Sequence, residues 1–263
     1  MSAGVRSPGR AQIEERTLRQ DRWWLMPLLV FLGFAAFIVY SSWRAFSGSH
    51  YYSAPYLSPF FSPCLATSCV SEASDFGQPI GDWWRLSPAL LILVFPLGFR
   101  LTCYYYRKAY YRAFWLSPPA CGVAEPHTKY TGETRFPLIF QNVHRYFWMA
   151  AVLVGLVLTY DTLLAFRNAD GEWGHMGLGT LLMIANIAFI WLYTLGCHSC
   201  RHIVGGRLRN FSKHPVRYKA WGFVSKLNAR HGLYAWLSLG SVALVDFYVY
   251  LLATDTITDL RFF

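Results

Sequence analysis

Long stretches of apolar residues alternate with polar segments along this chain of 263 residues. Each stretch approaches the roughly 20 residues that a helix needs to cross the hydrocarbon core of a bilayer. The stretches are continuous rather than alternating, which favours helices over the strands of a membrane barrel. We therefore predict an all-α integral membrane protein with five transmembrane helices in a bundle. The helices are expected at about residues 23–42, 86–106, 143–166, 176–196 and 233–254.

The composition agrees with a membrane protein. Hydrophobic residues make up 54% of the chain and charged residues only 14%, whereas a soluble domain carries roughly 25% charged residues. The first apolar stretch follows a polar, arginine-rich segment and lacks a small-residue cleavage site behind it. We therefore expect a retained helix rather than a signal peptide that is removed.

Basic residues indicate how the helices are oriented. They occur before the first stretch, after the second and after the fourth, whereas residues 46–84 and 168–175 contain no lysine or arginine. By the positive-inside rule, residues 1–22 form a cytoplasmic N-terminal segment, residues 23–254 the transmembrane domain and residues 255–263 an outer tail. The net charge of +10 then describes the cytoplasmic face, which could attract anionic lipid or a soluble partner. Nucleic acid is not expected, because no recognition motif accompanies the charge.

The cysteines fall on both sides of the membrane. Cys64 and Cys69 lie in the first outer loop, where an oxidising exterior favours a disulfide. The other four map to the cytoplasmic face, where a reducing compartment favours a metal or an iron–sulfur cluster. These four are Cys103, Cys121, Cys197 and Cys200.

Histidines join these cysteines at the same depth. His198 and His202 flank Cys200, while His144 opens the third predicted helix and His231 precedes the fifth. If the fourth helix continues through residues 197–202, its cysteines and histidines project to different sides. A metal site must therefore be shared between helices, unless the helix breaks after Gly196.

The ligand types leave several centres open. Two thiolates and two imidazoles are the ligand set of a Rieske-type [2Fe–2S] centre, whereas four thiolates suit an ordinary cluster or structural zinc. A haem would need axial histidines, and the first two predicted helices contain none. Buried cysteines that act simply as small apolar residues are a further alternative.

Other polar residues suggest binding at the membrane surface. Asp161 lies near the outer end of its helix, where we expect its side chain to reach water. Asp246 lies deeper in the membrane, where either a structural pair or a proton relay would explain an ionisable residue. Aromatic walls beside Arg and Tyr donors suit the flat head of a quinone. The aromatic and basic run of residues 104–115 offers this chemistry near the cytoplasmic face, as do His144, Arg145, Tyr146 and Trp148.

Three segments resemble a known family. They read LTCYYYRKAYYRAFWLSPPACGVAEPH, FPLIFQNVHRYFW and CHSCRHIVGGRLRNFSKHPVRY. They resemble the membrane-anchor, cytochrome b-type subunit of actinobacterial succinate dehydrogenase and fumarate reductase, and the resemblance covers residues from about 23 to 250. It implies a subunit of respiratory complex II in the plasma membrane that does not itself oxidise substrate. It also implies flavoprotein and iron–sulfur partner subunits on the cytoplasmic face, and electron transfer from succinate to menaquinone.

The resemblance also implies a cofactor. The broader family often holds b haems between transmembrane histidines, a pattern from which this chain departs, so haem b is the weaker expectation and a Rieske-like [2Fe–2S] centre the stronger. The implied thiolate candidates are Cys103, Cys121, Cys197 and Cys200, and the imidazole candidates are His198, His202 and, behind them, His144.

The resemblance further implies a quinone site near the cytoplasmic face. Its candidate contacts are Tyr106, Arg107, His144, Arg145 and Trp148, and an outer pocket near Asp161, Trp173 and His175 is the weaker expectation.

Two functions outside this assignment remain open on the sequence. Cys197 and Cys200 form a C-x-x-C pair that would suit a quinone-linked thiol oxidoreductase. That chemistry is usually directed outward, whereas this pair is predicted to face the cytoplasm. A scaffold without redox activity, holding structural zinc at most, is the other alternative.

Overall fold

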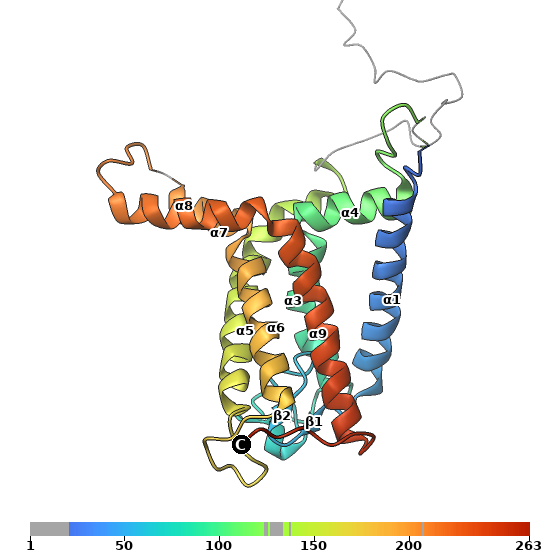
Figure 1. Ribbon diagram of the computed structural model, residues 1–263, viewed down its shortest axis with the longest axis vertical. Helices are drawn as coiled ribbons and strands as arrows, with labels where there is room; N and C mark the ends of the chain where they lie inside the picture. Colours follow the sequence, from blue (N-terminus) through green and yellow to red (C-terminus); the bar gives the residue numbers. More distant parts are fainter. Residues whose placement is uncertain (1–20, 124–125, 127–133, 137, 207) are drawn as a thin grey trace, which may run out of the picture.

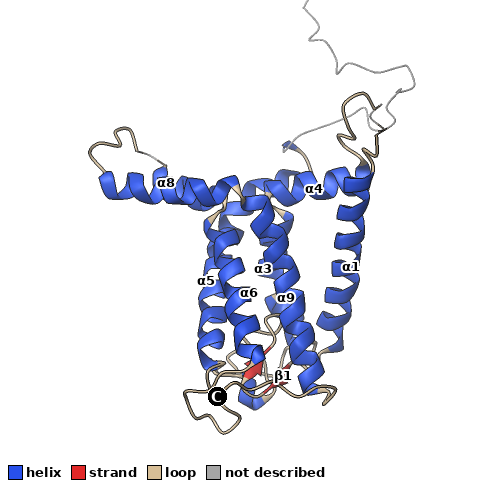
Figure 2. Ribbon diagram, in the orientation of Figure 1, coloured by secondary structure: helices blue, strands red, loops and turns tan. Residues whose placement is uncertain are grey.

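The computed structural model describes residues 21–123, 126, 134–136, 138–206 and 208–263. The predicted cytoplasmic segment 1–22 therefore lies outside the described residues, apart from its last two. The described chain is mostly helical (Figures 1 and 2). Its α-helices are α1 (Leu25–Ser47), α2 (Pro88–Ile92), α3 (Val94–Leu101), α4 (Tyr104–Trp115), α5 (His144–Leu164), α6 (Leu178–Leu195), α7 (His198–Gly205), α8 (Pro215–Ala229) and α9 (His231–Ala253). The described residues also form two short 3₁₀ helices, η1 (Ser71–Ala73) and η3 (Leu138–Val143), and a hairpin of strands β1 (Tyr52–Ser53) and β2 (Tyr56–Leu57).

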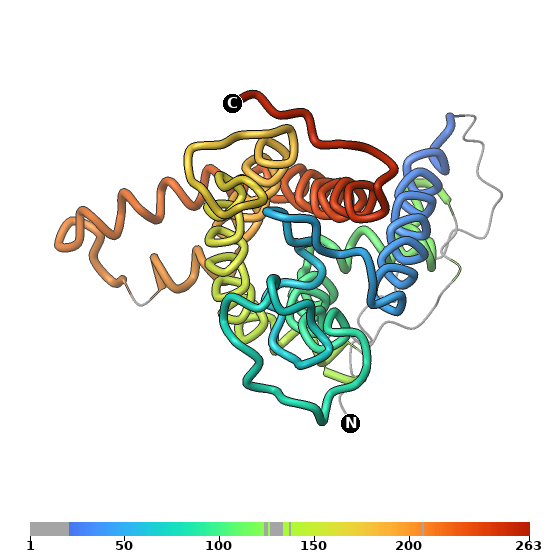
Figure 3. The backbone as a smooth tube through the Cα atoms, turned by 90° about the horizontal axis from the view of Figure 1, so that it is seen from below, coloured from blue at the N-terminus to red at the C-terminus, as the bar shows by residue number. Residues whose placement is uncertain are grey.

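Long apolar helices form the bundle. Within the described residues, four helices have the length and composition to cross a membrane: α1, α5 with the preceding η3, α6 and α9. They correspond to four of the five predicted stretches, and the prediction of an all-α membrane protein is confirmed. α6 and α9 pack along each other and α5 packs on α6, while α1 stands at the side of the bundle (Figures 1 and 3).

The predicted helix at residues 86–106 is not continuous. Pro96 has no backbone N–H, so the carbonyl of Ile92 loses its helical donor where α2 passes into α3. Residues 88–101 rise only about 20 Å at 1.5 Å per residue, short of the roughly 30 Å of hydrocarbon. The backbone then becomes extended at Cys103 (φ −69°, ψ 128°), and α4 leads off across the end of the bundle (Figure 1). A fifth long spanning helix is therefore not confirmed.

The segment between α1 and α2 packs against the opposite end of the bundle. Tyr51 stacks on Phe61 with ring centroids 4.3 Å apart, and both side chains are buried. The predicted disulfide between Cys64 and Cys69 is confirmed. The C-terminal tail lies at the same end, since Phe262 N–H donates to the Met176 carbonyl at 2.9 Å. This segment therefore completes the bundle where α2 and α3 are too short.

Two carboxylates are buried near this end. Asp246 forms an ion pair with Arg44 at 2.8 Å, and both side chains are fully buried. This favours a structural pair over the proton relay as the role of Asp246. Asp161 is only 4% exposed and accepts a hydrogen bond from Ser62. The expectation that Asp161 reaches water is therefore wrong, because the loop between α1 and α2 folds over it.

At the other end, α4, α7 and α8 lie roughly at right angles to the bundle axis (Figure 1). We call these three helices the platform. α7 and α8 extend sideways as one arm, and α4 points in the opposite direction. The platform gathers the ends of the bundle helices that carry the predicted cysteines and histidines.

Candidate functional site

Four side chains from different helix ends meet beneath the platform. Cys103 lies between α3 and α4, His144 begins α5, Cys197 lies between α6 and α7, and His231 begins α9. His144 Nε2 lies 3.1 Å from Cys197 Sγ, and His231 Nε2 lies 3.4 Å from Cys103 Sγ. We call these four residues the thiol–imidazole cluster. Both cysteines and His144 are buried, and His231 is half-buried.

The break after Gly196 places Cys197 in the cluster. A side chain at Gly196 would come within 2.7 Å of the Leu192 carbonyl oxygen and 3.3 Å of the Leu227 carbonyl oxygen. The chain becomes extended at Cys197 (φ −69°, ψ 145°) before α7 begins, and its Sγ accepts from Ser199 N–H at 3.4 Å. Cys197 therefore points back into the bundle, while the rest of the 197–202 run belongs to the platform.

The orientation of His144 follows from its hydrogen bonds. The Thr102 hydroxyl donates its single hydrogen to the Gly98 carbonyl at 2.7 Å. His144 Nδ1 lies 2.9 Å from the same hydroxyl oxygen, so Nδ1 is assigned as the protonated donor. The lone pair of Nε2 is then directed at Cys197, which is the tautomer that a metal ligand needs.

Aromatic rings fix both imidazoles. Phe99 stacks on His144 with centroids 5.1 Å apart and planes 9° apart. Tyr193 stacks on His231 at 4.8 Å and 16°. Each ring excludes water from one face of an imidazole, which makes the surroundings of the cluster largely apolar.

Two polar atoms of this region are left without partners. His231 Nδ1 and the Tyr193 hydroxyl are buried and make no hydrogen bond within the described residues. Buried polar groups are nearly always satisfied, so each of these points to a missing partner. Burial also raises the pKa of the Cys197 thiol to about 12. A thiol that stays neutral is a poor nucleophile, and a metal ion bound at Cys197 would have to displace its proton.

A cavity of about 1100 Å³ adjoins the cluster. Its walls come from the platform, from η3 and from the beginnings of α5 and α9. All four cluster residues line it, together with the cationic or neutral donors Arg145, His198, Asn228 and Arg230. The cavity is therefore large enough for an inorganic centre or for part of a small organic molecule.

The donor set suits a binuclear centre better than a single ion. Among the described residues, no three His, Cys, Asp or Glu side chains converge as ligands of one metal ion. The cluster instead offers two thiols and two imidazoles, which touch in two sulfur–nitrogen contacts. This number and type of donors fit a Rieske-type [2Fe–2S] group, in which two thiolates would bind one iron and two imidazoles the other.

The remaining predicted metal ligands lie elsewhere. Cys200 is buried in α7, outside the apolar core group that contains Cys103 and Cys197. Cys121 is exposed in a loop. His198 is exposed at the cavity wall, and His202 is exposed with its Nδ1 3.1 Å from an Arg145 nitrogen. The structure thus does not bring these four residues into the cluster.

Of the predicted quinone contacts, His144 and Arg145 line the cavity. The Tyr106 hydroxyl donates to the Ala235 carbonyl at 2.6 Å, and Trp148 Nε1 donates to the Thr194 carbonyl at 2.9 Å. Arg107 lies over the Tyr104 ring, 5.0 Å from its centroid. Tyr106 and Trp148 are therefore engaged in holding helices together.

Sequence reasoning noted His231 but did not select it as a ligand. The signal was its position at the start of the last apolar stretch, level with His144. The half-buried Arg100 was also overlooked. Its guanidinium lies over the Tyr193 ring at 5.0 Å and donates to the Ser238 hydroxyl at 3.2 Å, so it brings a positive charge close to the cluster.

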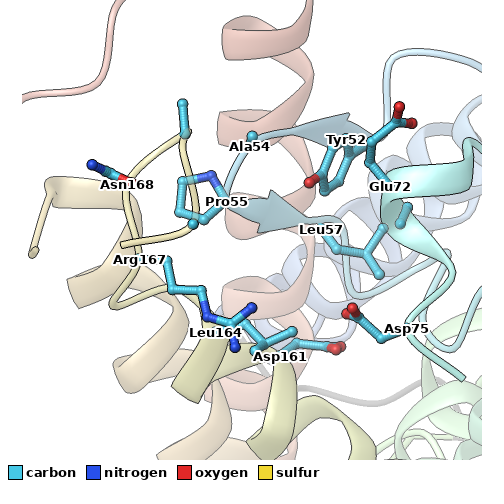
Figure 4. Close-up of a pocket in the computed structure, with 13 residues that line it drawn as sticks. Tyr52, Ala54, Pro55, Leu57, Glu72, Asp75, Asp161, Leu164, Arg167 and Asn168 are labelled. Atoms are coloured by element: carbon cyan, nitrogen blue, oxygen red, sulfur yellow. The ribbon is translucent and has the colours of Figure 1, made fainter. Parts of the chain in front are cut away.

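A smaller cavity lies at the opposite end (Figure 4). Its volume is about 110 Å³, and Asp75, Asp161 and Arg167 are among its lining residues. Neither Trp173 nor His175 lines it; Trp173 lies 4.3 Å from the Arg167 guanidinium. Sites for small molecules usually measure about 300–1,000 Å³, so this cavity is too small for the outer quinone pocket suggested by the sequence.

Comparison with known proteins identifies the family of the chain. Residues 25–255 match a family model described as actinobacterial succinate dehydrogenase subunit SdhC. A chain in the structure titled "Mycobacterium smegmatis Sdh1 complex in the apo form" is 59% identical, with a TM-score of 0.88 and complete coverage (100%) of both chains. No curated protein matches the chain. The family match extends over all the bundle helices and the whole cluster, and the chain therefore belongs to the SdhC family of membrane-anchor subunits of actinobacterial succinate dehydrogenase.

Proposed function

We propose that this chain anchors a succinate dehydrogenase complex in the plasma membrane and relays electrons from succinate-oxidising subunits to menaquinone. Its family and its likeness to a chain of an Sdh1 complex support the assembly. A flavoprotein and an iron–sulfur subunit would dock on the platform. The basic residues of the platform helices and the absence of lysine and arginine from residues 46–84 support a cytoplasmic platform.

In this orientation the chain crosses the membrane five times. α2 and α3 run from the outer end toward the platform (Figure 1), and the folded outer segment makes up the remaining thickness. The N-terminus is then cytoplasmic and the C-terminus outside, as the charge distribution predicts.

The observation that carries the electron-relay function is the thiol–imidazole cluster. We infer that Cys103, Cys197, His144 and His231 hold a Rieske-like [2Fe–2S] group. Such a group exchanges single electrons at a higher potential than an all-thiolate cluster. The unpartnered His231 Nδ1 and the lone pair directed at Cys197 from His144 support these ligands over Cys121, Cys200, His198 and His202.

The residues around the cluster orient its imidazoles, exclude water and add a positive charge. Thr102 fixes the tautomer of His144, and Phe99 and Tyr193 exclude water from the imidazole faces. Arg100 places a guanidinium nearby, which favours the arrival of an electron. Deprotonation of both thiols on metal binding would release two protons through the cavity.

Menaquinone would enter the mouth of the same cavity. Arg145, His198 and Arg230 line this mouth and can donate hydrogen bonds to the carbonyl oxygens of a quinone. His202 lies against Arg145 and steadies its guanidinium. Exposed histidines at the mouth can pass protons from water to the reduced quinone.

The C-x-x-C alternative loses support from the structure. The Cys197 thiol faces His144, and burial raises the pKa of both Cys197 and Cys200. A low pKa is what makes a catalytic thiol reactive. We therefore retain the electron relay as the proposed function.

Metal analysis of the intact complex tests the proposal. The complex carrying His231→Ala is expected to lose the electron paramagnetic resonance signal of the membrane centre and its two irons, while the soluble subunits still co-purify. The matched control His202→Ala, an exposed residue, should retain the iron. Full quinone reduction by a complex whose anchor holds no iron would refute the cluster.

A further inference from the structure

The arm of α7 and α8 projects beyond the bundle. It lies roughly at right angles to the bundle axis and extends past α5 (Figures 1 and 3). α6 ends at Leu195 just before the arm begins, and α9 begins at His231 just after it ends. Both α6 and α9 are long and apolar enough to cross a membrane. The arm therefore lies at the level of one membrane surface, where its outer part has no bundle helix beneath it.

An apolar stripe runs along α8. Successive helical residues turn by about 100°, so Val216, Ala220, Phe223 and Leu227 share one face of the helix. Leu227, at the inner end of the stripe, is buried, and α8 contacts α6 at that end. Farther out along the arm, Val216 is 78% exposed and Phe223 is 57% exposed. The face that packs on the bundle at one end is therefore uncovered along the rest of the arm.

α7 packs on a different side of α8. Arg201 of α7 donates to the Ser225 hydroxyl at 3.0 Å, and its guanidinium lies over the Trp221 ring at 4.9 Å. Ser225 and Trp221 project about 120° or more away from Leu227 around the helix. Because α7 lies beside α8 and the bundle lies beneath Leu227, the exposed part of the stripe is directed toward the membrane.

The charge of the arm has one sign. Residues 197–232 contain lysines and arginines but no aspartate or glutamate, and Lys226 is exposed near the inner end of the stripe. A basic helix with one apolar face is typical of segments that lie in the interface of an anionic membrane. An acidic soluble protein would match the charge, but it would not cover an apolar stripe that faces the hydrocarbon.

We propose that α8 is an interfacial helix that binds anionic phospholipids. Val216 and Phe223 enter the region of the acyl chains, and the basic segment as a whole attracts the phosphate groups. The opposite side of the arm stays in water and remains open to the soluble subunits. This inference goes beyond the proposed function and depends on neither the metal centre nor the quinone.

The test is photocrosslinking of the intact complex in vesicles made of equal parts phosphatidylglycerol and phosphatidylcholine. The photoreactive residue benzoylphenylalanine replaces Phe223, so the aromatic ring is kept and the change in shape is small. We expect the principal product, identified by mass spectrometry, to be a lipid adduct. The matched control replaces Tyr218, an exposed aromatic residue about 140° around α8 from Phe223. That position should lose the lipid adduct.

The head groups of the captured lipids test the preference for negative charge. The reference position is Phe247, an exposed aromatic residue in the spanning helix α9. The ratio of phosphatidylglycerol to phosphatidylcholine adducts should be about fivefold higher at Phe223 than at Phe247, which is the effect of about one basic residue at an anionic surface. Equal ratios would overturn the preference for anionic lipid.

Two further outcomes would overturn the interfacial helix itself. A crosslink from position 223 to a soluble subunit would mean that a protein covers the stripe. Absence of any adduct at 223, with normal lipid adducts at 247, would mean that the stripe faces water. Iron content and quinone reduction enter none of these measurements, so their loss would count against the proposed function alone.

Discussion

Arg44 and Asp246 form a fully buried ion pair, with Nε 2.8 Å from a carboxylate oxygen. Arg44 belongs to α1 and Asp246 to α9. The Asp246 carboxylate also accepts from the Tyr40 hydroxyl of α1 and from Ser58 of the outer segment. One carboxylate thus joins two long helices and the segment that covers their ends.

Removing one partner of this pair should be strongly destabilising. Asp246→Asn leaves the Arg44 guanidinium buried without its countercharge, a change that costs about 3–5 kcal/mol in comparable pairs. We expect a clear drop in the thermal unfolding temperature of the detergent-solubilised complex. The control Asp170→Asn alters an exposed carboxylate and should leave this temperature unchanged. An equally stable Asp246→Asn protein would mean that the pair is dispensable.

Thr102 should affect the metal without touching it. Thr102→Val removes the hydroxyl that accepts from His144 Nδ1, and the loss of such a partner typically weakens metal binding about 10–100-fold. The iron retained against a competing chelator measures this effect. Thr162 offers a matched control, because its buried hydroxyl donates to the Leu158 carbonyl in the same way but lies far along α5. If both variants retained iron equally well, Thr102 would have no role in orienting His144.

The two cysteines of the C-x-x-C pair should behave differently. Cys197→Ser is expected to abolish the iron signal, whereas Cys200→Ala should preserve both iron and quinone reduction, because Cys200 lies outside the cluster. Iron analysis and a quinone reductase assay on each complex distinguish them. Equal loss in both variants would favour a function that uses the pair together.

Arg217 should hold α8 in place. Its guanidinium donates to the carbonyl oxygens of Val204 and Gly206 at 3.0 and 3.1 Å, at the end of α7. In Arg217→Gln we expect faster amide hydrogen exchange across α8, with iron content unchanged. Lys219→Gln removes a nearby exposed charge and should leave exchange at its normal rate. Slow exchange in Arg217→Gln would show that apolar packing alone fixes this helix.

The bundle could be predicted because crossing a membrane imposes a length and composition that are visible in any window of the sequence. α5 and α6 fall within predicted stretches, whereas α1 and α9 overlap theirs and extend beyond them at one end. The interruption of residues 86–106 was missed because hydropathy does not register Pro96 or the extended backbone at Cys103. The burial of Asp161 could not be predicted either, since it depends on how the outer segment folds over the bundle.

The site could be predicted in part for the same kind of reason. The predicted topology places Cys103, His144, Cys197 and His231 at one end of the bundle, so their common depth could be predicted. The sequence does not show which of the neighbouring candidates turn inward, because that depends on the break after Gly196. The C-x-x-C spacing suggested one site, whereas the break directs Cys197 inward and leaves Cys200 in α7.

The position of the large cavity has a consequence for biogenesis. Its walls are built from α4, α7 and the beginnings of α5 and α9, on the side where the soluble subunits would dock. Under the proposed function, subunits docked on the platform would cover this cavity. Iron and sulfide would then have to reach Cys103 and Cys197 before docking, so the proposal implies an order of assembly in which inorganic loading comes first and the union of the subunits follows.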